Sequence, residues 1–148
     1  MDIQAVSGDF VQTKADALLI HLVEGEQLAG TSKAVDDALK GAVSEIIAAG
    51  DFTGKSGETL VIYTRGAILA QRVIVVGLGA NDKITLDTVR RATATGLLKA
   101  RDLKLKHVAG SAIEIEDSRF DTTASVQAMS EGAVLGHYQY HGQKSSDA

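Results

Sequence analysis

The sequence has 148 residues, the size of one ordinary domain, and a chain of this length can bury a substantial core. With 45% hydrophobic and 23% charged residues and a net charge of -4, it predicts a globular protein without overall attraction to nucleic acid or to an anionic membrane. The absence of cysteine excludes disulfides and thiolate metal sites, and no apolar run approaches the roughly 20 residues that span a bilayer. Because the amino terminus lacks a secretory pattern, we expect a cytoplasmic protein.

Two strands and a long helix are predicted in the first third of the chain. Residues 2–7 alternate polar and apolar side chains, which is typical of a strand with one buried face. Residues 16–22 are apolar nearly throughout, which is typical of a strand covered on both faces. Over residues 31–49 apolar side chains recur at helical spacing, and Thr31 or Ser32 can cap the first turn. We therefore expect one continuous helix after the second strand.

In the middle of the chain, two strands precede a second helix. Gly50 supplies a left-handed end to the first helix, and a glycine-containing loop leads to strands predicted at residues 59–64 and 72–76. The next helix is predicted to begin near Thr85, with Asp87 in its first turn. Its expected buried positions are Leu86, Val89, Thr93, Leu97 and Ala100.

The last third is predicted to hold a strand at residues 107–115 and a helix that starts at Asp121. That helix presents Val126, Met129, Ala133 and Gly136. Strands that alternate with helices predict a three-layer α/β/α sandwich with a mixed, mostly parallel sheet. We assign residues 1–137 to one domain, and the polar residues 138–148 to the start of a linker or to a disordered tail.

The strand at residues 72–76 runs into Gly77 and Gly79, which raises the question of a dinucleotide-binding loop. The G-x-G-x-x-G motif needs a third glycine, but Asp82 stands at that position and would repel a diphosphate. The next helix starts several residues later, so its amino-terminal dipole is not aimed at the two glycines. The pattern therefore favours a tight strand exit over a nucleotide site.

The Gly-Lys-Ser triplet at residues 54–56 resembles part of a phosphate-binding P-loop. A P-loop needs another glycine upstream, a preceding strand and a following helix. Here Ala49 occupies the glycine position, and the loop follows a helix and precedes a strand. We interpret it as a surface turn.

The histidines give no metal-binding pattern. His137 and His141 are four residues apart, as two ligands on one helix face can be, but Gly142 breaks such a helix and no third ligand is near in sequence. We interpret this pair as partly exposed side chains. His21 lies within an apolar strand and is interpreted as a core histidine rather than a catalytic base.

The carboxylates and hydroxyls give no catalytic pattern either. Asp36 and Asp37 fall away from the apolar stripe of their predicted helix, and Glu114 and Glu116 have the spacing of a solvent-facing strand side. No serine lies in a strained elbow such as G-x-S-x-G. The sequence therefore predicts no catalytic, cofactor-binding or metal-binding residue in this chain.

Positive charge gathers in a basic patch at residues 90–107, which contains Arg90, Arg91, Lys99, Arg101, Lys104, Lys106 and His107. Such a patch can hold phosphates in a salt-dependent way. It has no aromatic residues for base stacking, and Asp87 and Asp102 dilute its charge. A solvated helix surface is favoured, and contact with DNA stays open as the alternative.

Residues 16–30, 50–64, 72–92 and 131–140 resemble, in this order, the amino-terminal domain of leucyl aminopeptidases, also called cytosol aminopeptidases. The resemblance runs over about residues 15–144. It implies a domain similar to macro domains, with a mixed sheet between helices, that does not itself carry the catalysis.

In that family the two metal ions, zinc or manganese, and the NTDAEGR motif belong to a larger domain downstream, and this sequence lacks that motif. The resemblance implies that the chain is the non-catalytic amino-terminal domain of a cytoplasmic, hexameric leucyl aminopeptidase and needs no cofactor of its own. The implied partners are its own carboxyl-terminal catalytic domain and further copies of the parent. Its polar tail is then expected to be the start of the interdomain linker.

The likeness to macro domains keeps an ADP-ribose-type nucleotide open as an alternative ligand. Nucleotide-binding macro domains carry an asparagine-rich strand end and a glycine run where this sequence has His21 and residues 31–33. Those side chains would hinder the approach of the backbone to a diphosphate. We expect the scaffold to be retained and the ligand loops to be lost.

Overall fold

The structure is a computed structural model that describes residues 2–5, 9–111, 124 and 126–132. One sheet has the strand order β1-β5-β2-β4-β3. All neighbouring strands run parallel except β3 and β4, which are antiparallel, so the sheet is mixed and mostly parallel as expected. The strands are β1 (Asp2–Ala5), β2 (Ala17–Val23), β3 (Thr59–Tyr63), β4 (Arg72–Gly79) and β5 (His107–Gly110).

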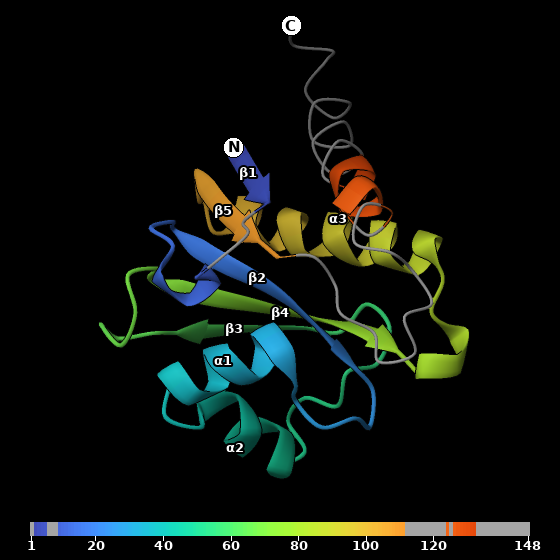
Figure 1. Ribbon diagram of the computed structural model, residues 1–148, viewed down its shortest axis with the longest axis horizontal. Coiled ribbons are helices and arrows are strands. Elements are labelled where there is room, and N and C mark those ends of the chain that lie inside the picture. The colour runs from blue at the N-terminus through green and yellow to red at the C-terminus, as the bar shows by residue number, and fades with distance from the viewer. Residues whose placement is uncertain (1, 6–8, 112–123, 125, 133–148) are drawn as a thin grey trace, which may run out of the picture.

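Helices cover both faces of this sheet (Figure 1). Val73 and Val75 of β4 belong to the core on the face covered by α1 and α2, whereas Ile74 and Val76 belong to the core under α3. This alternation confirms the predicted three-layer α/β/α sandwich. The first face carries η1 (Phe10–Gln12), α1 (Gly30–Ala38) and α2 (Ala42–Ala48). The second face carries α3 (Leu86–Asp102) and the helical residues 126–132. The short helix η2 (Asn81–Lys83) links β4 to α3.

The single helix predicted over residues 31–49 is wrong, because the structure has two helices there. Lys40 and Gly41 lie between α1 and α2 with φ angles of 59° and 84°, in the left-handed region that ends a helix. Apolar residues on both sides of this turn pack into the same core, so the helical spacing continues through the break. The predicted left-handed end at Gly50 is confirmed, with a φ angle of 82°.

The other elements begin close to their predicted positions. Thr85 caps α3, since its hydroxyl oxygen accepts the Thr88 N–H at 3.2 Å. β4 extends beyond its predicted end to Gly79, so both glycines of the strand exit are paired in the sheet. Met129 is buried as predicted, whereas residues 112–115, Ala133, Gly136 and the predicted boundary at residue 137 lie outside the described residues. No helix in the described part of the chain is long and apolar enough to cross a membrane.

Candidate functional site

Open α/β sheets bind ligands at the carboxyl ends of neighbouring strands whose following connections lead to opposite faces. β2 and β4 form such a pair, because the chain continues from β2 to α1 on one face and from β4 to α3 on the other. Gly77 and Gly79 lie at this end of β4, beside Leu22 and Val23 of β2. The glycine motif is therefore located where a nucleotide site would be expected.

A loop of the chain itself, residues 53–58, fills this position. The Gly79 N–H donates to the Gly54 carbonyl at 2.9 Å, and the Gly77 N–H donates to the Glu58 carbonyl at 2.8 Å. A Cβ atom at Gly77 would lie 2.1 Å from the carbonyl oxygen of Lys55. The glycines thus allow the loop to pack on the strand, which agrees with the interpretation as a tight strand exit.

The same loop contains an anion-binding nest, and Glu58 occupies it. The N–H groups of Thr53, Gly54 and Lys55 donate to Oε1 of Glu58 at 3.0, 2.9 and 3.2 Å. Partial burial raises the pKa of the Glu58 carboxyl, but these donors outweigh that effect and lower it. Converging N–H groups of this kind bind phosphates in other proteins, and here an internal carboxylate supplies the negative charge.

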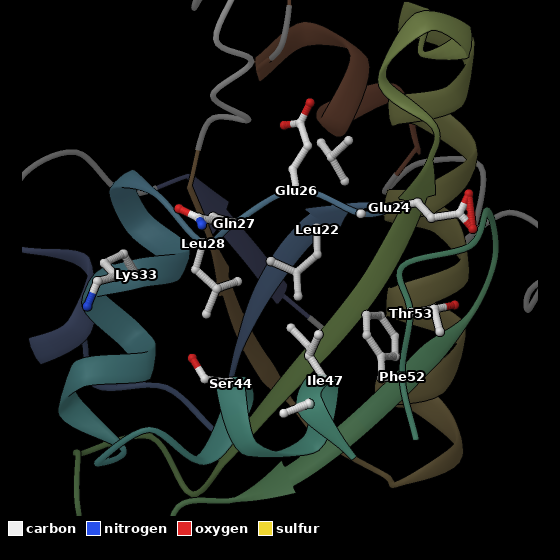
Figure 2. Close-up of a pocket in the computed structure, with 13 residues that line it drawn as sticks. Leu22, Glu24, Glu26, Gln27, Leu28, Lys33, Ser44, Ile47, Phe52 and Thr53 are labelled. Atoms are coloured by element: carbon white, nitrogen blue, oxygen red, sulfur yellow. The ribbon is translucent and has the colours of Figure 1, made fainter. Parts of the chain in front are cut away.

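A cavity of about 570 Å³ lies next to this loop, at the carboxyl end of β2 (Figure 2). Glu24 and Glu26 lie at its rim, and Glu26 accepts a hydrogen bond from the Asn81 side-chain amide at 2.5 Å. The cavity can accept an apolar group, and its charged lining disfavours phosphate because two carboxylates stand against one ammonium, that of Lys33, which is itself paired with Asp37. The side chains that point into it are Leu22, Leu28, Ile47 and Phe52.

His21 lies between β2 and α3 and has a defined partner. Its Nε2 is 3.2 Å from the Thr93 hydroxyl oxygen, and that hydroxyl donates to the Val89 carbonyl at 2.9 Å. Because the Thr93 hydroxyl has only one hydrogen, the Nε2–H of His21 donates to it. Burial lowers the pKa of His21 to about 4, so the imidazole is neutral at physiological pH. This geometry agrees with the interpretation as a core histidine.

The prediction that Asp36 faces away from the core is wrong. Asp36 is only 4% exposed, and its carboxylate accepts the Ser44 N–H at 2.9 Å and the Ser44 hydroxyl at 2.5 Å. Ser44 is in the first turn of α2, so a carboxylate from α1 caps α2. Asp37 does face solvent, where it pairs with Lys33 at 2.7 Å.

In the basic patch, two cations of α3 are paired with carboxylates. Arg90 contacts Asp87 at 3.0 Å and Glu131 at 3.1 Å, and Arg91 contacts Asp87 at 2.8 Å. These exposed pairs contribute little to stability, but they reduce the positive potential available to a phosphate backbone. DNA contact through this surface stays a prediction.

The remaining candidate residues, His137, His141, Glu114 and Glu116, lie outside the described residues. In the ranges that the structure does describe, no group of three or more His, Cys, Asp or Glu side chains is placed to share a metal ion.

Solved structures place the fold in the macrodomain-like class. The macrodomain of Mycobacterium tuberculosis DarG superposes with a TM-score of 0.69 at 16% identity, covering 94% of this chain and 91% of that one. A mutant of tomato leucine aminopeptidase superposes with a TM-score of 0.72 at 23% identity, covering 92% of this chain but 28% of that one. At these identities the similarity shows the fold alone.

The amino-terminal domain of the cytosol aminopeptidase family matches residues 18–147, and the chain belongs to this family. A "probable cytosol aminopeptidase" of Alkaliphilus oremlandii is 37% identical over 148 residues, which cover 99% of this chain and 30% of that protein. Another from Cupriavidus metallidurans is 43% identical over 94 residues, which cover 61% of this chain and 18% of that protein. The chain thus spans at most about 30% of the length of these relatives.

Proposed function

We propose that this chain is the non-catalytic amino-terminal domain of a leucyl aminopeptidase. The observation that carries the proposal is the family match over residues 18–147, combined with relatives of which the chain covers about 30%. The hydrolytic groups would then belong to the part of the parent that corresponds to the remaining length of those relatives. In such a parent, two divalent metal ions, zinc or manganese, would supply an activated water for hydrolysis of the amino-terminal peptide bond.

The packing at the carboxyl ends of β2 and β4 supports a scaffold role rather than a ligand-binding role. Loop 53–58 takes the position that a diphosphate would need, and Glu58 satisfies the N–H groups that could bind it. We therefore do not propose nucleotide binding, although the fold is similar to that of macrodomains. We further propose that the parent is cytoplasmic and hexameric, with this domain held by its own catalytic domain.

The proposal is tested with a chromogenic leucine anilide as substrate. We expect the purified chain to release no dye above the buffer rate with added zinc or manganese, because it lacks the hydrolytic part of the parent. The full-length Alkaliphilus oremlandii relative serves as the positive control, and a fusion of this chain to the rest of that relative should recover turnover. Chelator-sensitive activity that co-elutes with the isolated chain would contradict the proposal.

A further inference from the structure

We propose that β3 is an assembly edge at which two copies of this chain pair antiparallel through the same strand. β3 is the last strand in the sheet order and pairs with β4 on one side only. The inference is independent of catalytic function, because it rests on the hydrogen bonding, exposure and charge of this hairpin.

Bonds at the two ends of β3 fix which backbone groups face β4. Beyond the first residue of β3, the Gly77 N–H donates to the Glu58 carbonyl at 2.8 Å. Beyond the last residue of β3, the Thr64 N–H donates to the Gln71 carbonyl at 3.0 Å. Because residues of an antiparallel strand alternate between the two sides, these bonds set the direction of every group between them.

The alternation directs the backbone N–H and C=O groups of Leu60 and Ile62 toward β4. The same groups of Thr59, Val61 and Tyr63 therefore point away from the sheet. Within the described part of the chain, these outward groups have no hydrogen-bond partner. They form a free edge to which another strand can be added.

Nothing in β3 protects this edge. Natural edge strands are shielded by lysine, proline, a bulge or a covering segment, whereas the sequence TLVIY has no charge or proline and its register with β4 is regular. In the described residues, the large hydrophobic side chains that are exposed are Tyr63, at 59%, and Leu69, at 60%, and both belong to the hairpin of β3 and β4. Exposed apolar groups beside a free edge mark an interaction surface.

The exposed Tyr63 ring is held in place by a neighbour on β4. The guanidinium carbon of Arg72, directly opposite on β4, lies 5.2 Å from the ring centre. Hollows of about 350 and 720 Å³ flank the hairpin, and both are lined by residues 63–66. A ring held in place loses little conformational freedom on association, which favours binding.

A second copy fits this edge better than an unrelated strand because the edge is self-complementary. A two-fold axis at Val61 places Tyr63 of each copy opposite Thr59 of the other, and about six backbone hydrogen bonds would form. Residues 59–64 carry no charged side chain, so two copies can pair along this strand without bringing like charges together.

Sedimentation velocity of the chain over micromolar concentrations, with two variants and a control, tests the proposal. Val61→Pro removes an outward N–H that β4 does not use, and Tyr63→Lys places a charge in the interface. Gln127→Lys, at an exposed position on the helical residues 126–132, is the matched control. We expect the wild type to form a dimer and the dimer Kd to be at least about tenfold higher in both β3 variants. The Kd of the control should equal that of the wild type.

Hydrogen exchange of the Val61 amide supplies a readout that does not depend on the variants folding. In the dimer this amide should exchange slowly, and dilution should make its exchange fast. A chain that stays monomeric at all concentrations would overturn the proposal. So would a dimer in which the Val61 amide exchanges fast, or β3 variants that dimerise as tightly as the wild type.

Discussion

Gly77 lies where the strand and the loop are closest. A Cβ atom there would be 2.1 Å from the Lys55 carbonyl oxygen and 2.5 Å from backbone atoms of Gly54, and backbone atoms cannot rotate away. We expect Gly77→Ala to lower the free energy of unfolding by about 3 kcal/mol or more. Urea denaturation measures this loss.

Gly25→Ala is the control for Gly77→Ala. A Cβ atom at Gly25 would meet no atom within 4 Å, so the expected cost is only the left-handed strain at its φ angle of 76°, about 1 kcal/mol. Equal losses in the two variants would show that the loop does not depend on close approach to β4.

The sequence predicted the role of individual residues only where the deciding partner was near in the chain. Asp82 could be weighed against a dinucleotide loop from the sequence alone, because the G-x-G-x-x-G motif is local. That residues 54–58 pack on Gly77 and Gly79 was not visible, since the two segments are far apart in sequence and were interpreted separately. The Gly-Lys-Ser triplet and the pair Gly77 and Gly79 each resemble part of a phosphate-binding motif, and in the structure they pack against each other.

The contact between α1 and α2 gives a prediction at the level of elements. Asp36→Ala should remove the carboxylate that accepts the Ser44 N–H and hydroxyl, leaving the first turn of α2 uncapped. We expect a loss of about 1–2 kcal/mol in the free energy of unfolding, measured by thermal or urea denaturation.

Asp37→Ala provides the matched control for Asp36→Ala, because it deletes the neighbouring carboxylate of the same helix. Its ion pair with Lys33 is exposed, and such pairs contribute at most about 0.5 kcal/mol. If the two variants lost the same stability, the capping role of Asp36 would be refuted.

At the level of elements, the sequence predicted which segments are strands and helices better than where helices break. Val35, Leu39 and Val43 have the spacing of one helix because each packs into the core under the same sheet face. The break depends on Lys40 in a left-handed conformation, which its residue type does not favour. The inward direction of Asp36 follows from that break, so both errors have one cause.

At the level of the whole molecule, His21 makes stability depend on pH. Its pKa is about 4 in the fold and about 6.5 when unfolded, so between these values the unfolded chain binds a proton that the folded chain does not. Stability should be complete above pH 6.5 and fall as the pH drops toward 4. Because the residue retains some solvent-accessible surface, we expect a loss of about 2 kcal/mol, less than a fully enclosed ring would give.

Chemical denaturation at a series of pH values measures this loss. His21→Gln, which can keep a donor to Thr93, should flatten the profile between pH 6.5 and 4. The carboxyl groups of Asp16 and Glu58 have pKa values lowered chiefly by backbone donors. Their contributions to stability are therefore lost at a lower pH than that of His21, as the pH falls below the ordinary pKa of a carboxyl group. An unchanged slope in His21→Gln would exclude His21 as its source.

The architecture could be predicted because it follows from burial. Strands that are apolar on both faces need helices on both sides, which gives the three layers without knowledge of any contact. The antiparallel direction of β3, its position at the edge and the packing of loop 53–58 on β4 depend on contacts distant in sequence. The sequence therefore predicted the layers, and only the structure located the free edge.

Glu58 has a consequence for how the domain behaves in a cell. A fold that completes its anion nest with its own side chain needs no phosphate there to satisfy the three N–H groups. A phosphate-bearing metabolite would have to displace this carboxylate before it could reach the three N–H groups.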